Sequence, residues 1–97
     1  MAVLREIENP WQAPYRAFVF HCPGCDDNHM IDTSWGWNGE FDKCSFLPSL
    51  LIRGHADGND YVCHSFIKDG RIQFLGDCTH SMVNTEVQLP DFDNFIN

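Results

Sequence analysis

Apolar and polar residues alternate over short stretches of this chain, and turn-forming residues separate the stretches at short intervals. A period of two is typical of half-buried β-strands, whereas the 3.6-residue period of an amphipathic helix is scarce here. The pattern therefore predicts a mostly β domain of short antiparallel hairpins, with a small α+β fold as the alternative. The expected strands are residues 15–21, 29–34, 50–53, 61–68, 71–75 and 86–89.

The best-defined hairpin is predicted at residues 61–75, around the dipeptide Asp69-Gly70. Asp-Gly is favourable in a two-residue type I′ turn, because both central residues adopt a positive φ. If Lys68 lies opposite Arg71, the alternation of side chains assigns every residue of the hairpin to a face, unless a bulge at Gly76 shifts the register. One face then holds Cys63, Ile67, Ile72, Phe74 and Cys78, and the other holds His64, Phe66, Leu75 and Asp77.

Two further turns are expected from local composition. The dipeptide Asn38-Gly39, flanked by Trp37 and Phe41, predicts a second hairpin, and the polar residues 54–60 predict a loop. The aromatic residues near Asn38-Gly39 could form a binding platform, but a domain this small needs most of its rings to fill its core. We therefore expect burial for Trp35, Trp37, Phe41 and Phe46.

The length of 97 residues fits one domain, for which we expect an ordered core at about residues 15–90 and less ordered tails. The apolar share of 43% is too high for a disordered chain. No stretch resembles a membrane span or a signal peptide, so we expect a cytoplasmic protein without membrane association. A formal charge of −8 would repel the phosphate backbone, so we expect no nucleic-acid partner.

Five cysteines are many for a cytoplasmic chain of this size, where disulfides are kept reduced. Metal binding is therefore the favoured reason for them. The CPGC motif at residues 22–25 has the form of a zinc knuckle, because two intervening residues let both thiolates reach one tetrahedral ion. A thioredoxin-like redox role would need a helix after the first cysteine, and the pattern predicts none.

The two remaining zinc ligands are expected from the hairpin at residues 61–75 and the segment that follows it. Cys63 and Cys78 share a face there, so we favour a zinc ion bound by Cys22, Cys25, Cys63 and Cys78. Cys44 has no donor at metal spacing and is expected to be a non-ligand. The alternate ligands are His80, which would replace a hairpin thiol, and His64 and His29.

Ser49, His64 and Asp77 are candidate catalytic residues, since His64 and Asp77 share a face and Ser49 could come close to them. However, no nucleophile elbow surrounds Ser49, and a serine after proline commonly serves as a turn or cap residue. A second catalytic arrangement is a metal hydrolase site with an open coordination position. Its residues would be His29, His64 and His80 with Asp77.

The segments CPGC, WGWNGEF, FLPSLLI, CHSFIKDGRIQFLGDCTH and VQLPDF occur in one order between residues 20 and 92. With these segments in this order, the chain resembles a family of small phage and prophage proteins of unknown function. Its members often carry the label "ammonia monooxygenase", which does not suit a short chain without membrane spans. The family is more distantly similar to proteins encoded beside bacterial ubiquitin-like conjugation genes. That similarity implies a peptidase or a conjugation-related role.

The sequence as a whole favours a zinc-stabilised binding or host-inhibitory module over an enzyme. Its partner would be a host or phage protein in the host cytoplasm, and the chain would act as a monomer or small homo-oligomer. The alternative is a zinc-dependent hydrolase or peptidase, acting on ubiquitin-like conjugates. A binding module should have all four metal positions filled by protein, whereas an enzyme should leave one to water.

Overall fold

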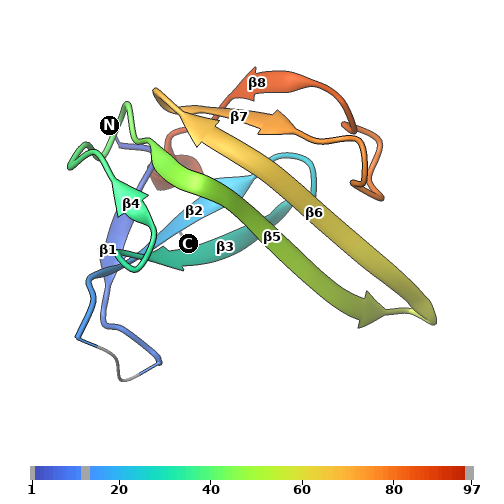
Figure 1. Cartoon of the computed structure of the whole chain (residues 1–97), viewed down its shortest axis with the longest axis horizontal. Coiled ribbons are helices and arrows are strands. Elements are labelled where there is room, and N and C mark those ends of the chain that lie inside the picture. Colours follow the sequence, from blue (N-terminus) through green and yellow to red (C-terminus); the bar gives the residue numbers. More distant parts are fainter. Residues whose placement is uncertain (1, 12–13, 96–97) are drawn as a thin grey trace.

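The structure is a computed structural model that describes residues 2–11 and 14–95. Two antiparallel sheets account for nearly all of its regular structure (Figure 1), which confirms the predicted mostly β fold. The first sheet has the order β1-β2-β3 and the second the order β4-β5-β6-β7-β8. The strands are β1 (Arg5–Ile7), β2 (Ala17–Cys22), β3 (Asp27–Asp32), β4 (Gly36–Trp37), β5 (Phe46–Ala56), β6 (Asn59–Lys68), β7 (Arg71–Phe74) and β8 (Glu86–Gln88), and a short 3-10 helix, η1 (Phe92–Phe95), follows them.

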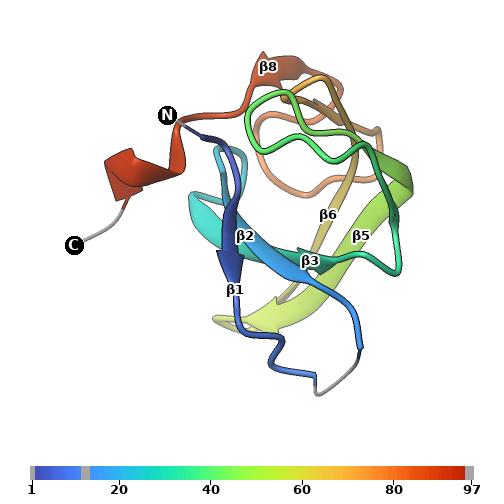
Figure 2. The same cartoon turned by 90° about the vertical axis from the view of Figure 1, so that its left-hand side faces the viewer.

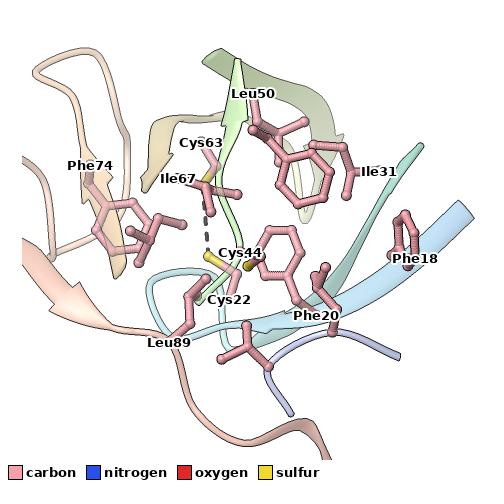
Figure 3. Packing of buried hydrophobic residues seen from close by; sticks show 14 of the residues in the cluster. Phe18, Phe20, Cys22, Ile31, Cys44, Leu50, Cys63, Ile67, Phe74 and Leu89 are labelled. Atoms are coloured by element: carbon pink, nitrogen blue, oxygen red, sulfur yellow. Dashed lines mark hydrogen bonds between the residues drawn. The ribbon is translucent and has the colours of Figure 1, made fainter. Parts of the chain in front are cut away.

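The core lies between the apolar faces of the two sheets (Figures 2 and 3). Phe18 and Phe20 of β2 are fully buried, as are Ile72 and Phe74 of β7. Val3 and Leu4, which precede the expected core, are also buried, and Phe92 of η1 is 7% exposed. No helix in the part of the chain that the structure describes is long and apolar enough to cross a membrane.

The hairpin of β6 and β7 has the predicted register. Lys68 lies opposite Arg71, and the pairing continues to Ser65 opposite Phe74. Asp69 and Gly70 have φ values of 52° and 76°, as a type I′ turn requires. The predicted separation of faces follows, because Cys63, Ile67, Ile72 and Phe74 are buried while Phe66 and Asp77 are exposed.

The predicted loop at residues 54–60 is wrong. β5 continues to Ala56 and β6 begins at Asn59, so a second tight turn at Asp57 and Gly58 joins them. These residues have φ values of 53° and 79°, which again suits a type I′ turn. The polar residues misled the prediction because this end of the hairpin is exposed on both faces and so lacks the apolar alternation of a half-buried strand.

The predicted two-residue hairpin at Asn38-Gly39 is also wrong. β4 pairs with the start of β5, where Trp37 lies opposite Phe46, so the connection is a long loop. The Asn38 side chain holds this loop together: its amide donates to the carbonyl of Lys43, and its oxygen accepts from the backbone of Glu40 and Ser45. Asn38 therefore stabilises the loop through its side chain, which a dipeptide rule does not consider.

Candidate active site and metal centre

Ser49 lies in a bulge near the start of β5. The five residues of β5 from Phe46 to Leu50 lie opposite only three residues of β6, from Ile67 to Ser65. Pro48, inside this bulge, has no N–H to donate to a regular ladder. Bulges re-aim side chains and are common beside active sites. Here the bulge leaves the Ser49 hydroxyl 3.1 Å from Nε2 of His64, on the neighbouring strand.

His64 lies on the solvent-facing side of β6, and its ring bridges two partners. Its Nδ1 is 3.0 Å from Oδ2 of Asp77 and 3.2 Å from Oδ1. An ionised carboxylate only accepts hydrogen bonds, so Nδ1 carries the ring proton and donates a hydrogen bond to Asp77. Nε2 is then unprotonated, and it accepts the hydrogen bond from the Ser49 hydroxyl. The histidine is thus held in the tautomer that a general base requires.

The Ser49–His64–Asp77 arrangement joins three separate segments of the sequence: the bulge in β5, the middle of β6 and the loop after β7. The backbone N–H of Leu75 donates to the His64 carbonyl at 2.9 Å, which brings the loop that carries Asp77 back to β6. The indole N–H of Trp35 donates to the Ser49 carbonyl at 2.9 Å and fixes the bulge from the other side. The structure therefore brings together all three sequence candidates for nucleophilic catalysis.

This arrangement is open to solvent. The side chain of His64 is 26% exposed and that of Asp77 is 52% exposed. Ser49 is itself only half-buried, so the arrangement is accessible from the outer face of the second sheet. The carboxylate, however, is less shielded than in a buried triad, so its field at His64 is partly screened by water.

A second cluster lies in the core, where Cys63 of β6 meets Cys22, Cys25 and His29 of the first sheet and its β2–β3 turn. The sulfurs of Cys22, Cys25 and Cys63 and a ring nitrogen of His29 all lie within 4.8 Å of one another. Cys22 and Cys63 approach to 3.9 Å between their sulfurs (Figure 3). Three thiols and one imidazole at this spacing could hold one tetrahedral metal ion, and they are the ligands that zinc prefers.

The protonation of the thiols reflects their crowding. A hydrogen bond from Cys63 is the main cause that lowers the pKa of Cys22 to about 4; burial opposes this effect, and His29 contributes to it. Burial and the neighbouring Cys22 charge raise the pKa of Cys25 to about 11. The pKa of Cys63 is raised because its proton is held by Cys22. A bound metal would stabilise several thiolates in this crowded cluster.

Of the three remaining sequence candidates for the metal, Cys78 and His80 form a second group with Cys63, whereas His64 belongs to neither group among the described residues. The Cys78 sulfur accepts from the His64 N–H at 3.3 Å and donates to the His64 carbonyl at 3.2 Å. Nδ1 of His80 accepts from the Met82 N–H at 3.2 Å, so its ring proton lies on Nε2. A protonated nitrogen cannot bind a metal, which makes His80 the poorer donor in this conformation.

His29 is better placed as a donor. It is 8% exposed, and its buried Nε2, like that of His80, has no hydrogen-bond partner within the described residues, but only His29 lies in the group of four potential ligands. A buried polar atom without a partner is costly, and a metal ion would satisfy it. The sequence named His29 only as an alternate ligand, since its spacing from Cys25 is not specific. The pairing of β2 with β3 brings His29 close to the CPGC cysteines, because it places His29 opposite Phe20 on the strand that follows the CPGC turn.

The fifth cysteine, Cys44, is fully buried and belongs to neither group of potential ligands among the described residues. Burial raises its pKa to about 12, so it remains a neutral thiol. This agrees with its expected role as a non-ligand.

Two of the catalytic candidates are direct sequence neighbours of cysteines. Cys63 precedes His64, and Cys78 follows Asp77. Because side chains alternate along a strand, Cys63 points into the core while His64 points outward. The thiol cluster and the Ser49–His64–Asp77 arrangement therefore meet β6 from opposite sides.

Comparison with known proteins agrees with this geometry. The family model described as "Bacterial ubiquitination-like system serine protease (BubE)" matches residues 4–75, which include Ser49 and His64, while Asp77 lies just beyond the matched range. No curated protein and no solved structure is detectably similar to the chain. The family match covers most of the chain and agrees with the similarity to ubiquitin-like conjugation systems inferred from the sequence. The chain therefore belongs to the bacterial ubiquitination-like system serine protease (BubE) family.

Proposed function

We propose that the protein is a serine protease in which Ser49 is the nucleophile, His64 the general base and Asp77 the group that orients His64. The observation that carries this proposal is the continuous hydrogen-bonded series from the Ser49 hydroxyl through both ring nitrogens of His64 to Asp77. The sequence favoured a binding module and named zinc hydrolysis as its alternative. Family membership and the geometry at Ser49 favour serine chemistry over both.

The reaction follows from the positions of these atoms. Ser49 Oγ attacks the carbonyl carbon of the substrate amide and transfers its proton to His64 Nε2. Asp77 stabilises the positive charge that develops on the ring, while Nδ1 keeps its proton. His64 then donates the Nε2 proton to the leaving amine, and the C–N bond breaks to give an acyl-enzyme. Water, activated by His64, hydrolyses this ester and restores the free Ser49 hydroxyl.

The substrate class follows from the family description. A protease of a ubiquitination-like system would cleave an amide bond in a ubiquitin-like modifier, in its precursor or in its conjugate. The protein partner expected from the sequence would then be the substrate itself. The open setting of Ser49, on the face of a sheet, is compatible with a protein substrate.

A fluorophosphonate probe tests the nucleophile. Ser49 Oγ would form a bond to phosphorus, fluoride would leave, and the proton would pass to His64. We expect stoichiometric labelling of the wild-type protein and none of Ser49→Ala, with mass spectrometry locating the adduct on Ser49. Ser81→Ala is the matched control, because Ser81 is exposed and lies outside the site. Labelling that persists in Ser49→Ala would overturn the proposal.

We further propose that Cys22, Cys25, Cys63 and His29 bind one structural Zn²⁺. The support is their mutual spacing, the soft thiol donors and the buried Nε2 of His29. With four protein ligands, such an ion has no open position for water, so it would stabilise the fold and take no part in the cleavage. The set expected from the sequence differs in one member, since it used Cys78 in place of His29.

Elemental analysis of two variants separates these ligand sets. The wild-type protein should contain about one zinc per chain. His29→Ala should lose most of the metal, whereas Cys78→Ala should keep it. The reverse pattern would favour the sequence-based set, and wild-type protein without metal after expression in zinc-supplemented medium would contradict both.

A further inference from the structure

The outer face of the second sheet carries exposed apolar side chains beside Ser49 and His64. Leu47 is 69% exposed, Leu51 44% and Phe66 42%. Isolated exposed apolar residues are ordinary, but several of them around one functional site commonly mark a binding surface. Their arrangement relative to Ser49 therefore indicates how a substrate is held.

A hollow of about 640 Å³ lies on this face, toward the Asp69-Gly70 turn. Leu47, Pro48 and Phe66 line it. Pro48 directly precedes Ser49, and Phe66 follows His64 by two residues on the same face of β6, which is about 7 Å along the strand. The hollow thus begins next to both the nucleophile and the base.

The wall of the hollow next to Ser49 is apolar, formed by Leu47, Pro48 and Phe66. Its charged lining residues are Lys68, Asp69, Arg71 and Glu86, of which the last two neutralise each other through an ion pair of 2.7 Å. These charged groups lie farther from Ser49: Lys68 and Asp69 toward the turn, and the ion pair on β7 and β8. A charged substrate group beside Ser49 would lose its hydration there without gaining a partner, whereas an apolar group would gain contact area.

We propose that this hollow is a specificity subsite, which receives an apolar side chain of the substrate immediately beside the bond to be cleaved. This inference rests on the proposed function, because it requires Ser49 to be the nucleophile. A polypeptide attacked at Ser49 must extend over the outer face of the second sheet, and the side chain next to the cleaved bond would then meet the apolar wall of this hollow. Phe66 and Leu47 are the residues that determine the specificity.

Leu51 provides a matched control. It lies on the same outer face, directly opposite His64, and its exposed fraction is close to that of Phe66. It does not line the hollow. A general effect of surface apolarity would therefore appear in Leu51→Ser as well as in Phe66→Ser, whereas a subsite effect would appear only in Phe66→Ser.

Two fluorophosphonates that differ only in one substituent on phosphorus, methyl or benzyl, provide the test. Their second-order rate constants for labelling Ser49 are measured on the wild type, Phe66→Ser and Leu51→Ser. A subsite that recognises a large apolar group should favour the benzyl probe at least about tenfold in the wild type. Phe66→Ser should reduce this ratio to within about threefold of unity while changing the methyl rate little, and Leu51→Ser should keep the ratio. Thermal unfolding confirms that both variants fold.

The outcomes separate this inference from the proposed function. If neither probe labels Ser49, the proposed function fails, and the subsite with it. If both probes label Ser49 of the wild type at similar rates, the nucleophile stands and the subsite is overturned. An equal loss of selectivity in Phe66→Ser and Leu51→Ser, or retained selectivity in Phe66→Ser, also overturns the subsite.

Discussion

Replacement of Asp77 by asparagine tests how His64 is activated. The carboxylate accepts a hydrogen bond from Nδ1 of His64, with 3.0 Å between Nδ1 and Oδ2, and it faces the positive charge that develops on the ring. Asparagine has nearly the same shape but no charge, and its amide group can donate to Nδ1 and select the wrong tautomer. We therefore expect Asp77→Asn to retain the fold and lose catalytic rate.

The size of the expected rate loss follows from the distance between the two charges and from their exposure to solvent. Two unit charges about 4 Å apart attract by about 1 kcal/mol in bulk water and by about 4 kcal/mol at an effective dielectric constant near 20. At 1.36 kcal/mol per factor of ten, this range corresponds to about a fivefold to about a 900-fold loss of rate. His64 is 26% exposed and Asp77 52% exposed, so neither limit applies fully. We expect about a 10²-fold loss, compared with about 10⁴-fold for the buried aspartate of chymotrypsin-type enzymes.

The assay is the second-order rate constant for fluorophosphonate labelling of Ser49, measured beside thermal unfolding. The β5–β6 hairpin supplies a control in His55 and Asp60, a His–Asp pair at 2.8 Å for which the described residues show no hydrogen bond to a serine. Asp60→Asn should leave the labelling rate within about twofold of wild type, since exposed substitutions away from a site have small effects. The reasoning would be refuted if Asp77→Asn also stayed within that range, or if Asp60→Asn lowered the rate as much as Asp77→Asn.

Three further predictions concern stability. Cys25→Ser should lose zinc and unfold at 25 °C, because structural zinc supplies on the order of 10 kcal/mol of folding free energy. Cys44→Ser should keep zinc and lower the free energy of unfolding by about 1 to 2 kcal/mol. Zinc content and circular dichroism check both variants, and a folded, zinc-loaded Cys25→Ser would contradict this prediction. Gly24→Ala should cost about 1 to 3 kcal/mol in urea unfolding, because a Cβ there would lie 2.4 Å from Cε1 of His80; a cost near zero would show that this ring moves freely. Phe74→Ala, at a site 1% exposed, should cost about 3 to 5 kcal/mol in the same assay, and less than 1 kcal/mol would contradict its place in the core.

The sequence predicted the parts of the fold that depend on neighbouring residues. The Asp69-Gly70 turn determined the register of β6 and β7, and the register separated Cys63 from His64 by face. It also placed His64 and Asp77 on the same side, where the structure shows them hydrogen-bonded. These predictions succeeded because a two-residue turn leaves no freedom in how its strands pair, and because strand side chains alternate strictly.

The tertiary structure decided how distant segments meet. The approach of Ser49 to His64 depends on the bulge between Phe46 and Leu50, and no turn motif in the sequence marks that bulge. The place of His29 among the thiols depends on the packing of the first sheet against the second, which composition and spacing do not fix. The physical reason is the same for both. Turn chemistry acts over two to four residues, whereas the Ser49–His64 contact and the thiol cluster come from contacts between strands that the core, and not the local sequence, brings together.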